Sequence, residues 1–504
     1  MKHWRALAGA VLLWAIEGRG QSPVLAHAQP GAARPGETTE VLFFGENLSG
    51  GAQLWTSFAA PAVPGSATNS AERDSGRQVF RVTLPRNARP GVGAVRVATT
   101  NGVSGLLLFA VDALASVSAS RTNKSAAAAQ GLRLPVAVEG VIEELLSDYY
   151  KFNARRGERV NVEVVAQRLG SRLDPVVRLF DAQGRELAYS DDEPGLGADA
   201  RLTWLCPATG EYVLELRDIL YEGGARHRYR LRVGGAPWPA RGVSPDGAET
   251  AEVEPNDTGA TATRFAVPAV LSGNFARNQD RDFYQFEAAK NERLVFRAQT
   301  RSLGSPGEVF LQVQRTDGTK VAEARVNGAD EGTLTNTFGD AGGYRLLVEE
   351  LNRRGGPGFF YRVAVAPLRA GFELSVDTDR LEAAPGGSFE LKVSCARREY
   401  DGPITLALDG AGDGFTLENA VIPEKKNEAT LKARVPAGLA PGAMRRFRVT
   451  GRARIGDHEE IVTASTLPAL RRQFPQMPYP PPELDGWLAL GVKAPVGADS
   501  GKVR

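Results

Sequence analysis

The sequence predicts an all-β protein made of β-sandwich domains in a row. Its 504 residues are several times the usual domain length, which favours about three to five units that each bury a core. The 56 glycines and 31 prolines, beside only 24% charged residues, are typical of short strands joined by many turns. Apolar and polar residues alternate along much of the chain, and no segment has the pattern of a helix of three turns or more.

The centre of the chain contains an internal duplication. The segment 148–152 (DYYKF) recurs as 282–286 (DFYQF), 134 residues later, and the triplet Leu-Gly-Ser at 169–171 recurs at 303–305 with the same offset. Two tyrosines further on recur at an offset of 132, so two residues are missing from a loop of the second copy. A repeat of this length indicates one structural unit made twice.

The residues within each copy alternate as they do in β-strands. Val160, Val162 and Val164 share one face of an extended chain, while Asn161 and Glu163 take the opposite, solvated face. Their counterparts in the second copy are Leu294, Phe296 and Ala298. Strands of this kind, bounded by turns that contain Gly and Asp, predict an antiparallel sandwich in each copy.

The chain on either side of the duplication also has strand-like runs, for example 39–44 and 78–84 before it and 388–394 and 429–435 after it. We expect four β-sandwich domains in a row, between a signal peptide and a tail. The expected boundaries are a signal peptide at 1–28, an immunoglobulin-like sandwich at 29–112, the two copies at 113–234 and 250–367, a second immunoglobulin-like sandwich at 370–467, and a Pro-rich tail at 468–504.

The amino terminus has the order of a secretory signal. Lys2 and Arg5 precede an apolar run from Ala6 to Ile16, and small residues flank His27 as they do at a signal-peptidase site before Gln29. The run is too short to span a bilayer, and no later stretch is long enough either. We therefore expect a secreted, periplasmic or cell-envelope protein that is not inserted in the membrane once its signal is cleaved.

The charge balance and the cysteines exclude some classes of function. The net charge of +2 gives no field that would steer the chain to nucleic acid. Cys206 and Cys395 fall in different expected domains, so they are expected as two small buried thiols rather than as a disulfide or a metal site.

The duplicated segments resemble the bacterial pre-peptidase C-terminal domain, a β-sandwich often appended to secreted peptidases and related to the collagen-binding domains of collagenases. In the first copy the resemblance lies in 148–152, 173–175 (LDP), 191–195 (DDEPG) and 210–212 (GEY), and in the second copy also in 252–257 (EVEPND), an opening sequence typical of the family. It covers about half of the chain. It implies two jelly-roll-like sandwiches of this type between the immunoglobulin-like modules.

Acidic side chains gather where the second copy begins. Glu252, Glu254 and Asn256 are spaced by two, so an extended chain presents their oxygens on one side, and Asp257 follows directly. Asp280 and Asp282 have the same spacing just before the repeated strand and would meet the others if the opening segment folds back. Such a cluster suits Ca²⁺, which prefers oxygen ligands, and the related collagen-binding domains hold calcium at the matching positions. The alternative is a solvated acidic turn.

We expect no catalytic site. Of the histidines only His227 and His458 lie after the signal, and both are expected to be structural, because no nucleophile-elbow or zinc-binding pattern accompanies them. A two-carboxylate glycosidase leaves no sequence signature, but nothing recommends one. Trp55 is a weak candidate for stacking on a sugar, and the acidic loop at 191–193 is a weak second cation candidate.

These observations favour a secreted, non-catalytic binding or adhesion protein that recognises an extracellular polysaccharide or a partner protein. Two alternatives stay open. One is an accessory, non-catalytic chain of a secreted peptidase, and the other is a structural spacer of the cell envelope.

Overall fold

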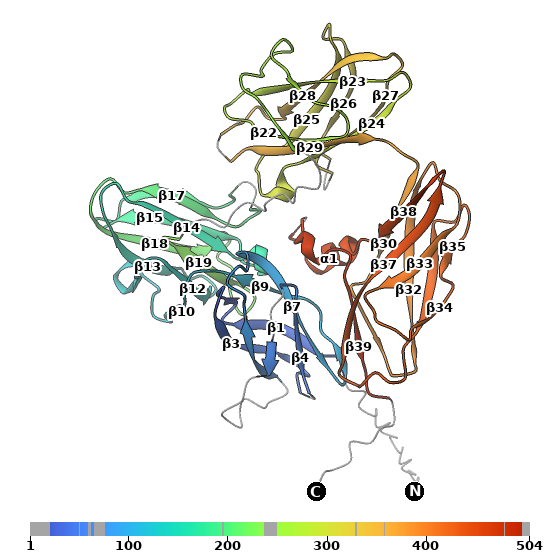
Figure 1. Ribbon diagram of the computed structural model, residues 1–504. Helices are drawn as coiled ribbons and strands as arrows, with labels where there is room; N and C mark the ends of the chain where they lie inside the picture. The colour runs from blue at the N-terminus through green and yellow to red at the C-terminus, as the bar shows by residue number, and fades with distance from the viewer. Residues whose placement is uncertain are drawn as a thin grey trace, which may run out of the picture.

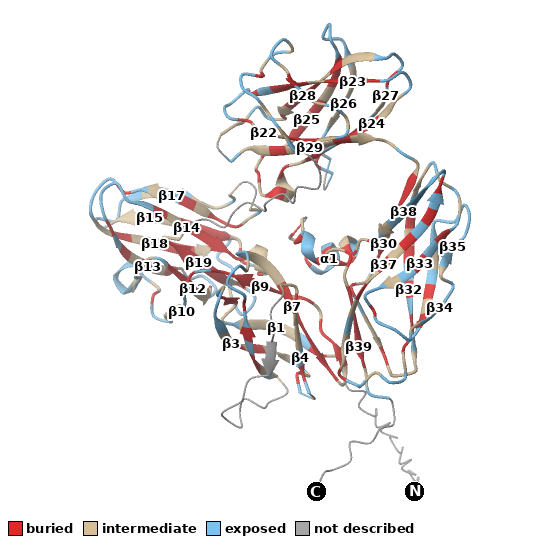
Figure 2. Cartoon of the chain, in the orientation of Figure 1, coloured by how far each residue is buried: buried red, intermediate tan, exposed pale blue. Residues whose placement is uncertain are grey.

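The computed structural model describes residues 21–49, 51–58, 62–64, 76–193, 196–235, 249–327, 330–356, 358–477 and 479–495. The predicted all-β class is confirmed, because within these residues strands pair into sheets that pack in twos as successive β-sandwiches (Figure 1). Buried residues concentrate between the paired sheets (Figure 2). Each sandwich thus has a core of its own, as the alternation of apolar residues predicts.

The first sandwich pairs a sheet of order β1-β3-β6-β5 with one of order β2-β9-β7-β4, and β8 adds to β7. Val41, Phe43, Phe80 and Phe109 fill the space between them. The strands are β1 (Val24–Gln29), β2 (Ala32–Ala33), β3 (Thr38–Glu46), β4 (Gln53–Thr56), β5 (Ala62–Pro64), β6 (Arg77–Thr83), β7 (Gly91–Thr99), β8 (Gly102–Val103) and β9 (Leu107–Val111).

The position of β1 corrects one expected boundary. Residues 24–28 were assigned to the signal peptide, but the structure places them in the first sandwich, where β1 runs antiparallel to β3 with Ala28 opposite Phe43. The ring of His27 stacks on that of Phe44 with centroids 4.2 Å apart. The first domain therefore begins near Val24 rather than at Gln29. The apolar run 6–16 lies outside the described residues.

The two copies of the duplication fold with the same topology. The first has sheets of order β10-β12-β19-β14-β17 and β11-β13-β18-β15-β16, and in the second every strand number is higher by ten. The predicted inner face holds, because Val160, Val162 and Val164 are all buried in β14. The expectation that Glu163 is solvated is wrong, because its side chain is buried among arginines that offset its charge. In both copies a 3₁₀ turn ends in a left-handed glycine, Gly170 or Gly304, a conformation that glycine adopts without strain.

The elements of the first copy are β10 (Ser116–Ser118), η2 (Ala126–Ala128), β11 (Gln130–Gly131), β12 (Val136–Val141), β13 (Asp148–Ala154), β14 (Arg159–Val165), η3 (Gln167–Leu169), β15 (Pro175–Asp181), β16 (Glu186–Ser190), β17 (Arg201–Leu205), β18 (Gly210–Asp218) and β19 (Arg228–Val233). Those of the second copy are β20 (Glu249–Ala251), β21 (Thr263–Arg264), β22 (Ala269–Asn274), β23 (Arg281–Ala288), β24 (Arg293–Gln299), η4 (Arg301–Leu303), β25 (Val309–Arg315), β26 (Lys320–Arg325), β27 (Thr333–Thr337), β28 (Gly342–Glu350) and β29 (Phe360–Pro367).

The last sandwich pairs a sheet of order β30-β32-β36-β34 with one of order β31-β39-β37-β33-β35, and β38 adds to β37. Its elements are β30 (Gly371–Val376), β31 (Arg380–Ala383), β32 (Ser388–Arg398), β33 (Ile404–Asp409), β34 (Thr416–Glu418), β35 (Val421–Ile422), β36 (Glu428–Arg434), β37 (Met444–Ile455), β38 (His458–Thr463), α1 (Leu467–Gln473), η5 (Pro482–Leu484) and β39 (Leu488–Val492).

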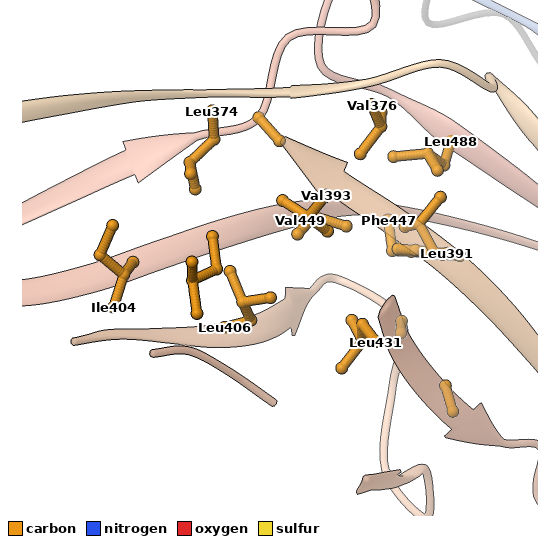
Figure 3. Packing of buried hydrophobic residues seen from close by; sticks show 14 of the residues in the cluster. Leu374, Val376, Leu391, Val393, Ile404, Leu406, Leu431, Phe447, Val449 and Leu488 are labelled. Atoms are coloured by element: carbon orange, nitrogen blue, oxygen red, sulfur yellow. The ribbon is translucent and has the colours of Figure 1, made fainter. Parts of the chain in front are cut away.

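The prediction of a Pro-rich tail after residue 467 is wrong for the residues that the structure describes, which reach 495. β39 inserts between β31 and β37, parallel to the first and antiparallel to the second, and all five of its residues are buried. Figure 3 shows Leu488 of this strand in the same core as Val376 and Phe447. The chain passes through the Pro-rich segment and returns to complete the last sandwich.

Ion pairs and hydrogen bonds join the first sandwich to two others. Asp112, fully buried, accepts hydrogen bonds from Nε of Arg230 and Nε of Arg232 in the first copy, both at 2.9 Å. On its other side, Arg96 pairs with Asp379 of the last sandwich. The first sandwich (blue) thus lies between the first copy and the last sandwich, and the second copy, at the top of the view, contacts the last sandwich through Arg297 and Glu373 (Figure 1).

Candidate metal centre

The segment that leads into the second copy lies beside the start of β23. After β20, which runs parallel to β22, residues 252–257 form what we call the lead-in segment. The backbone N–H of Phe283 donates to the carbonyl oxygen of Asn256 at 3.0 Å. This contact brings the side chains of the lead-in segment against Asp280 and Asp282, as the two-residue spacing predicts for a segment that folds back.

Three carboxylates meet at this point. Oxygen atoms of Glu254, Asp280 and Asp282 all lie within 4.8 Å of one another. Asp280 and Asp282 are 3% and 0% exposed, whereas Glu254 reaches the surface. The backbone N–H of Ala276 donates to Oδ2 of Asp280 at 2.6 Å, but Oδ1 of Asp280 and Oδ2 of Asp282 are buried without a hydrogen-bond partner in the described chain. Buried oxygens of this kind need a cation or protons to offset their charge.

Asn256 adds a fourth polar side chain, and it is fully buried. In one orientation its amide nitrogen donates to Oε2 of Glu254 at 3.1 Å and to Oδ1 of Asp282 at 3.0 Å. In the other orientation the amide oxygen faces the same two carboxylates. In the second orientation the amide oxygen and the carboxylate oxygens repel one another. A cation between them would make the arrangement favourable, because each of these oxygens could then be its ligand.

Glu252 and Asp257, also expected in the group, have other partners. Oε1 of Glu252 accepts the backbone N–H of Asn274 at 2.8 Å and Oε2 accepts the hydroxyl of Tyr361 at 3.2 Å. Asp257 is turned away and accepts both of its hydrogen bonds from Nη2 of Arg277, at 2.7 and 2.8 Å. The structure therefore places Glu252 beside the three-carboxylate group and Asp257 outside it.

Burial and the charge of neighbouring carboxylates raise the pKa of two side chains here, Asp282 and Glu252. Burial, and then the charge of Glu252, raises the pKa of Asp282 to about 8. Burial likewise raises the pKa of Glu252, and the carboxylates of Glu254 and Asp280 add to the rise. A bound cation would reverse this cost, because it favours the charged form of each neighbouring carboxylate.

The first copy keeps the backbone of this site and changes its charges. The N–H of Tyr149 donates to the carbonyl oxygen of Asn123 at 2.7 Å, and Asn123 is fully buried, as Asn256 is. The register of the two lead-in strands places Ala119 and Arg121 where Glu252 and Glu254 lie.

A lysine supplies the positive charge in the first copy. Nζ of Lys124, which follows Asn123, donates to Oδ1 of the buried Asp148, the counterpart of Asp282. The same ammonium lies 3.3 Å from Oε1 of Glu143. Tyr229, the counterpart of Tyr361, donates to the other oxygen of Asp148. The buried aspartate therefore has a lysine as its ion-pair partner in the first copy, whereas Asp282 has no ion pair within the described residues of the second copy. The nearest cation there, Nη2 of Arg277, lies 3.7 Å from Oδ1 of Asp280.

The donor set of the second copy fits a hard divalent cation. All of its candidate ligands are carboxylate or amide oxygens, with no histidine or cysteine in the three-carboxylate group. Calcium takes six to eight oxygens in flexible geometry, so carboxylates, the amide of Asn256 and water suit it better than they suit zinc.

The other candidates from the sequence join no such group, although both ring nitrogens of His227 are buried without a hydrogen-bond partner in the described residues. Oδ2 of Asp191 accepts the hydroxyl of Tyr189 at 2.7 Å, and the described part of the 191–193 loop joins no three-carboxylate group. His227 is buried, with Nε2 3.6 Å from Glu222, and His458 is exposed at the surface. The two free thiols, Cys206 and Cys395, are buried.

Sequence reasoning missed Tyr361 and Lys124. Tyr361 was recognised as a repeated residue, but its role as a donor to Glu252 depends on β29 lying beside the lead-in segment. Lys124 was overlooked because the first copy lacks the acidic opening sequence. Aligning the two copies through their buried asparagines, Asn123 and Asn256, would have placed this lysine next to Asp148.

No family model matches the chain. A stretch of 70 residues is 37% identical to a probable subtilase-type serine protease of Deinococcus radiodurans, which covers 14% of this chain and 9% of that protein. The chain therefore spans less than a tenth of this curated relative.

Solved structures with similarity to the chain include the pre-peptidase C-terminal domain of a collagenase from Bacillus anthracis, at 18% identity and a TM-score of 0.18, over 21% of this chain and 93% of that one. Another is a protein from Eubacterium rectale described as secreted, at 9% identity and a TM-score of 0.16, over 46% of this chain and 74% of that one. No helix in the described residues is long and apolar enough to cross a membrane.

Proposed function

We propose that this chain is a secreted, non-catalytic binding protein in which the second copy is a calcium-holding β-sandwich of the pre-peptidase C-terminal type. The observation that carries the calcium part is the pair of buried carboxylate oxygens, on Asp280 and Asp282, that have no hydrogen-bond partner beside Glu254. The contrast with the first copy supports it, because Lys124 supplies a positive charge at the equivalent aspartate.

The position of the site gives the cation a structural task. The lead-in segment is where the chain enters the second copy, and its Glu254 and Asn256 face Asp280 and Asp282 at the start of β23. A cation held between them would fasten the start of the domain to its sheet. Calcium would thereby set the direction in which the chain enters the domain. A protein that carries binding surfaces on several domains needs such fixed directions to keep the surfaces in place relative to one another.

We propose a class of ligand, an extracellular polysaccharide or protein. Four sandwiches with edges and loops exposed favour recognition of an extracellular polysaccharide or protein by these surfaces. The second candidate, an accessory chain of a secreted peptidase, is favoured by the 70-residue match to a probable subtilase-type serine protease. Retention of the full chain on chitin, peptidoglycan or collagen would support the first, and stable co-elution with a peptidase would support the second.

Calcium binding is tested on the full chain by isothermal titration after treatment with a chelator. We expect about one calcium per chain with a Kd roughly between 10⁻⁶ and 10⁻³ M. At about 100 times the Kd the ion should stabilise the second copy by about 2.7 kcal/mol, seen as a higher unfolding temperature.

Glu254→Gln and Asp280→Asn should abolish the heat of binding. Asp340→Asn is the matched control, because Asp340 pairs with Arg315 at the opposite end of β23 from the group, and it should bind calcium as the unchanged chain does. An absence of binding heat together with an unfolding temperature that ignores the chelator would refute the calcium site.

A further inference from the structure

A row of arginines lies on the outer face of β37 in the last sandwich. Alternate residues of a strand point to opposite faces, and in this strand Phe447 and Val449 point into the core. The residues on the other face, which are half-buried or exposed, are Arg446, Arg448, Thr450, Arg452 and Arg454. Neighbours on this face are about 7 Å apart along the strand, and the row consists of two pairs of arginines separated by Thr450.

Two of these arginines cluster on a tryptophan. The guanidinium carbons of Arg446 and Arg448 lie 3.6 and 4.1 Å from the ring centroid of Trp487, which precedes β39. Arg446 also lies 5.4 Å from the ring centroid of Trp55, which belongs to the first sandwich. Trp55, Arg446 and Trp487 line one crevice at the junction of the two sandwiches, and its volume of about 10 Å³ means that a polymer would lie across its mouth rather than inside it. The row therefore begins at this junction and runs outward along β37.

The two arginines at the junction have no acidic partner. Neither Arg446 nor Arg448 forms an ion pair or a side-chain hydrogen bond with the described residues, and Nε of Arg448 is buried without an acceptor. Asp409 is opposite Arg448 in the sheet register but is not ion-paired with it. Arg452, by contrast, lies 3.4 Å from Glu459. Burial, and then the charge of Arg448, lowers the pKa of Arg446, as expected for neighbouring cations that no anion offsets.

This combination of groups defines the chemistry of a ligand. Unpaired guanidinium groups form forked hydrogen bonds with carboxylate or sulfate. The half-buried ring of Trp55 next to them offers an apolar surface of the kind on which a sugar ring packs. Several arginines along one strand also match a polymer with repeated anionic groups better than a single small anion. The net charge of only +2 makes the attraction local to this face.

We propose that the junction of the first and last sandwiches, with the arginine row of β37, binds an acidic polysaccharide. Arg446 and Arg448 pair with carboxylate or sulfate groups of the sugar, and Trp55 packs against a ring. This inference names the ligand class for the binding function proposed above and rests on it.

The test uses the full chain and four probes of similar length, which are an oligogalacturonide, a sulfated heparin-derived oligosaccharide, neutral malto-oligosaccharide and inorganic polyphosphate. Binding is followed by tryptophan fluorescence and titration calorimetry. We expect one or both acidic sugars to bind, with affinity falling about tenfold between roughly 50 and 200 mM salt. The charge-removing variant R446Q/R448Q should weaken binding at least about tenfold, which corresponds to about 1.4 kcal/mol.

R434Q is the matched control, because Arg434 is an exposed arginine on the other sheet of the same sandwich. It should bind as the unchanged chain does, and unfolding temperatures will show whether each variant is folded. R446K/R448K, which keeps the charge, should recover part of the affinity if R446Q/R448Q proves unstable.

No binding of either acidic sugar, equal binding of the neutral sugar, or equal binding of polyphosphate would each overturn the proposal. Retention on chitin, peptidoglycan or collagen without acidic-sugar binding would refute this inference and leave the broader binding function standing. Assays in chelator keep the outcome independent of the calcium site.

Discussion

Replacing Lys124 by methionine removes the internal cation of the first copy while keeping most of the volume of the side chain. The ammonium is 19% exposed and donates to Asp148, whose side chain is 1% exposed. After the change, Asp148 would keep the hydrogen bond from Tyr229 and lose its positively charged neighbour. The variant therefore measures how much the free energy of unfolding falls when the buried carboxylate at this position has no cation beside it. The equivalent Asp282 of the second copy is in that situation in the absence of metal.

The expected cost follows from the burial of the pair. Breaking a buried ion pair by removing one partner costs about 3–5 kcal/mol. The remaining hydrogen bond from Tyr229 and the partial exposure of the lysine place this case near the lower end, at about 3 kcal/mol. For a domain of this size the loss corresponds to a drop of about 10 °C in its unfolding temperature. Calorimetry of the full chain, with hydrogen exchange of β13 to identify the domain, measures it.

The cost should depend on pH. Burial already raises the pKa of Asp148 despite Lys124, and removal of the lysine should raise it further. When the pKa of a carboxyl group is higher in the folded than in the unfolded protein, the protein loses stability as the pH rises from the unfolded-state pKa to the folded-state pKa. The destabilisation should therefore be full above the folded-state pKa and fade toward about pH 4, where aspartate is also protonated in the unfolded chain.

A double variant provides the control. Asp148→Asn in the Lys124→Met background removes the unpaired charge and should recover most of the lost stability at neutral pH, with no dependence on calcium. A loss below about 1 kcal/mol for the single variant at pH 7, or an equal loss at pH 4 and pH 8, would refute the reasoning.

Three further predictions concern another ion pair of the first copy, the core of the last sandwich and the contact between the first two domains. Burial opposes the ionisation of Glu163, but three neighbouring arginines outweigh it and lower its pKa from 4.5 to about 2. The stability that ionised Glu163 contributes should be complete above pH 4.5 and lost toward pH 2. In Glu163→Gln, the free energy of unfolding measured with urea should no longer show this dependence on pH. Leu490→Ala in β39 should cost about 2–5 kcal/mol in thermal unfolding, whereas the exposed Leu205→Ala should cost almost nothing; equal effects would argue against β39 as a core strand. Asp112→Asn removes a buried partner of Arg230 and should undock the first sandwich from the first copy, seen as a larger radius of gyration in X-ray scattering; an unchanged radius would contradict this role.

Local pattern was enough to predict the strands at the centre of the chain. Val160, Val162 and Val164 alternate with polar residues, and a strand with one buried face leaves this trace in the sequence whatever its neighbours are. The duplication reinforced the prediction, since the same alternation recurs in Leu294 and Phe296, which are also buried. The all-β class follows from this pattern together with the frequent turns.

The carboxylate group could be predicted in part. The spacing of Glu254 and Asn256, and of Asp280 and Asp282, indicated which side chains share a face, and the structure brings all four together. The position of Asp257 could not be predicted in the same way. Its side chain follows Arg277, and that contact depends on the path of a loop rather than on strand periodicity.

By itself, the sequence determined the class of the fold, the doubling of its central unit and the residues that share each strand face, because these properties are encoded between near neighbours. Only the tertiary structure decided that β1 and β39 complete sandwiches, that Lys124 takes the role of a cation, and that Trp55 meets Arg446. Each of these depends on a partner distant in sequence. The free energy of such a contact comes from burying apolar surface in the strands and from charge attraction at Lys124 and Arg446, and it is gained only when folding brings together residues that the linear order keeps apart.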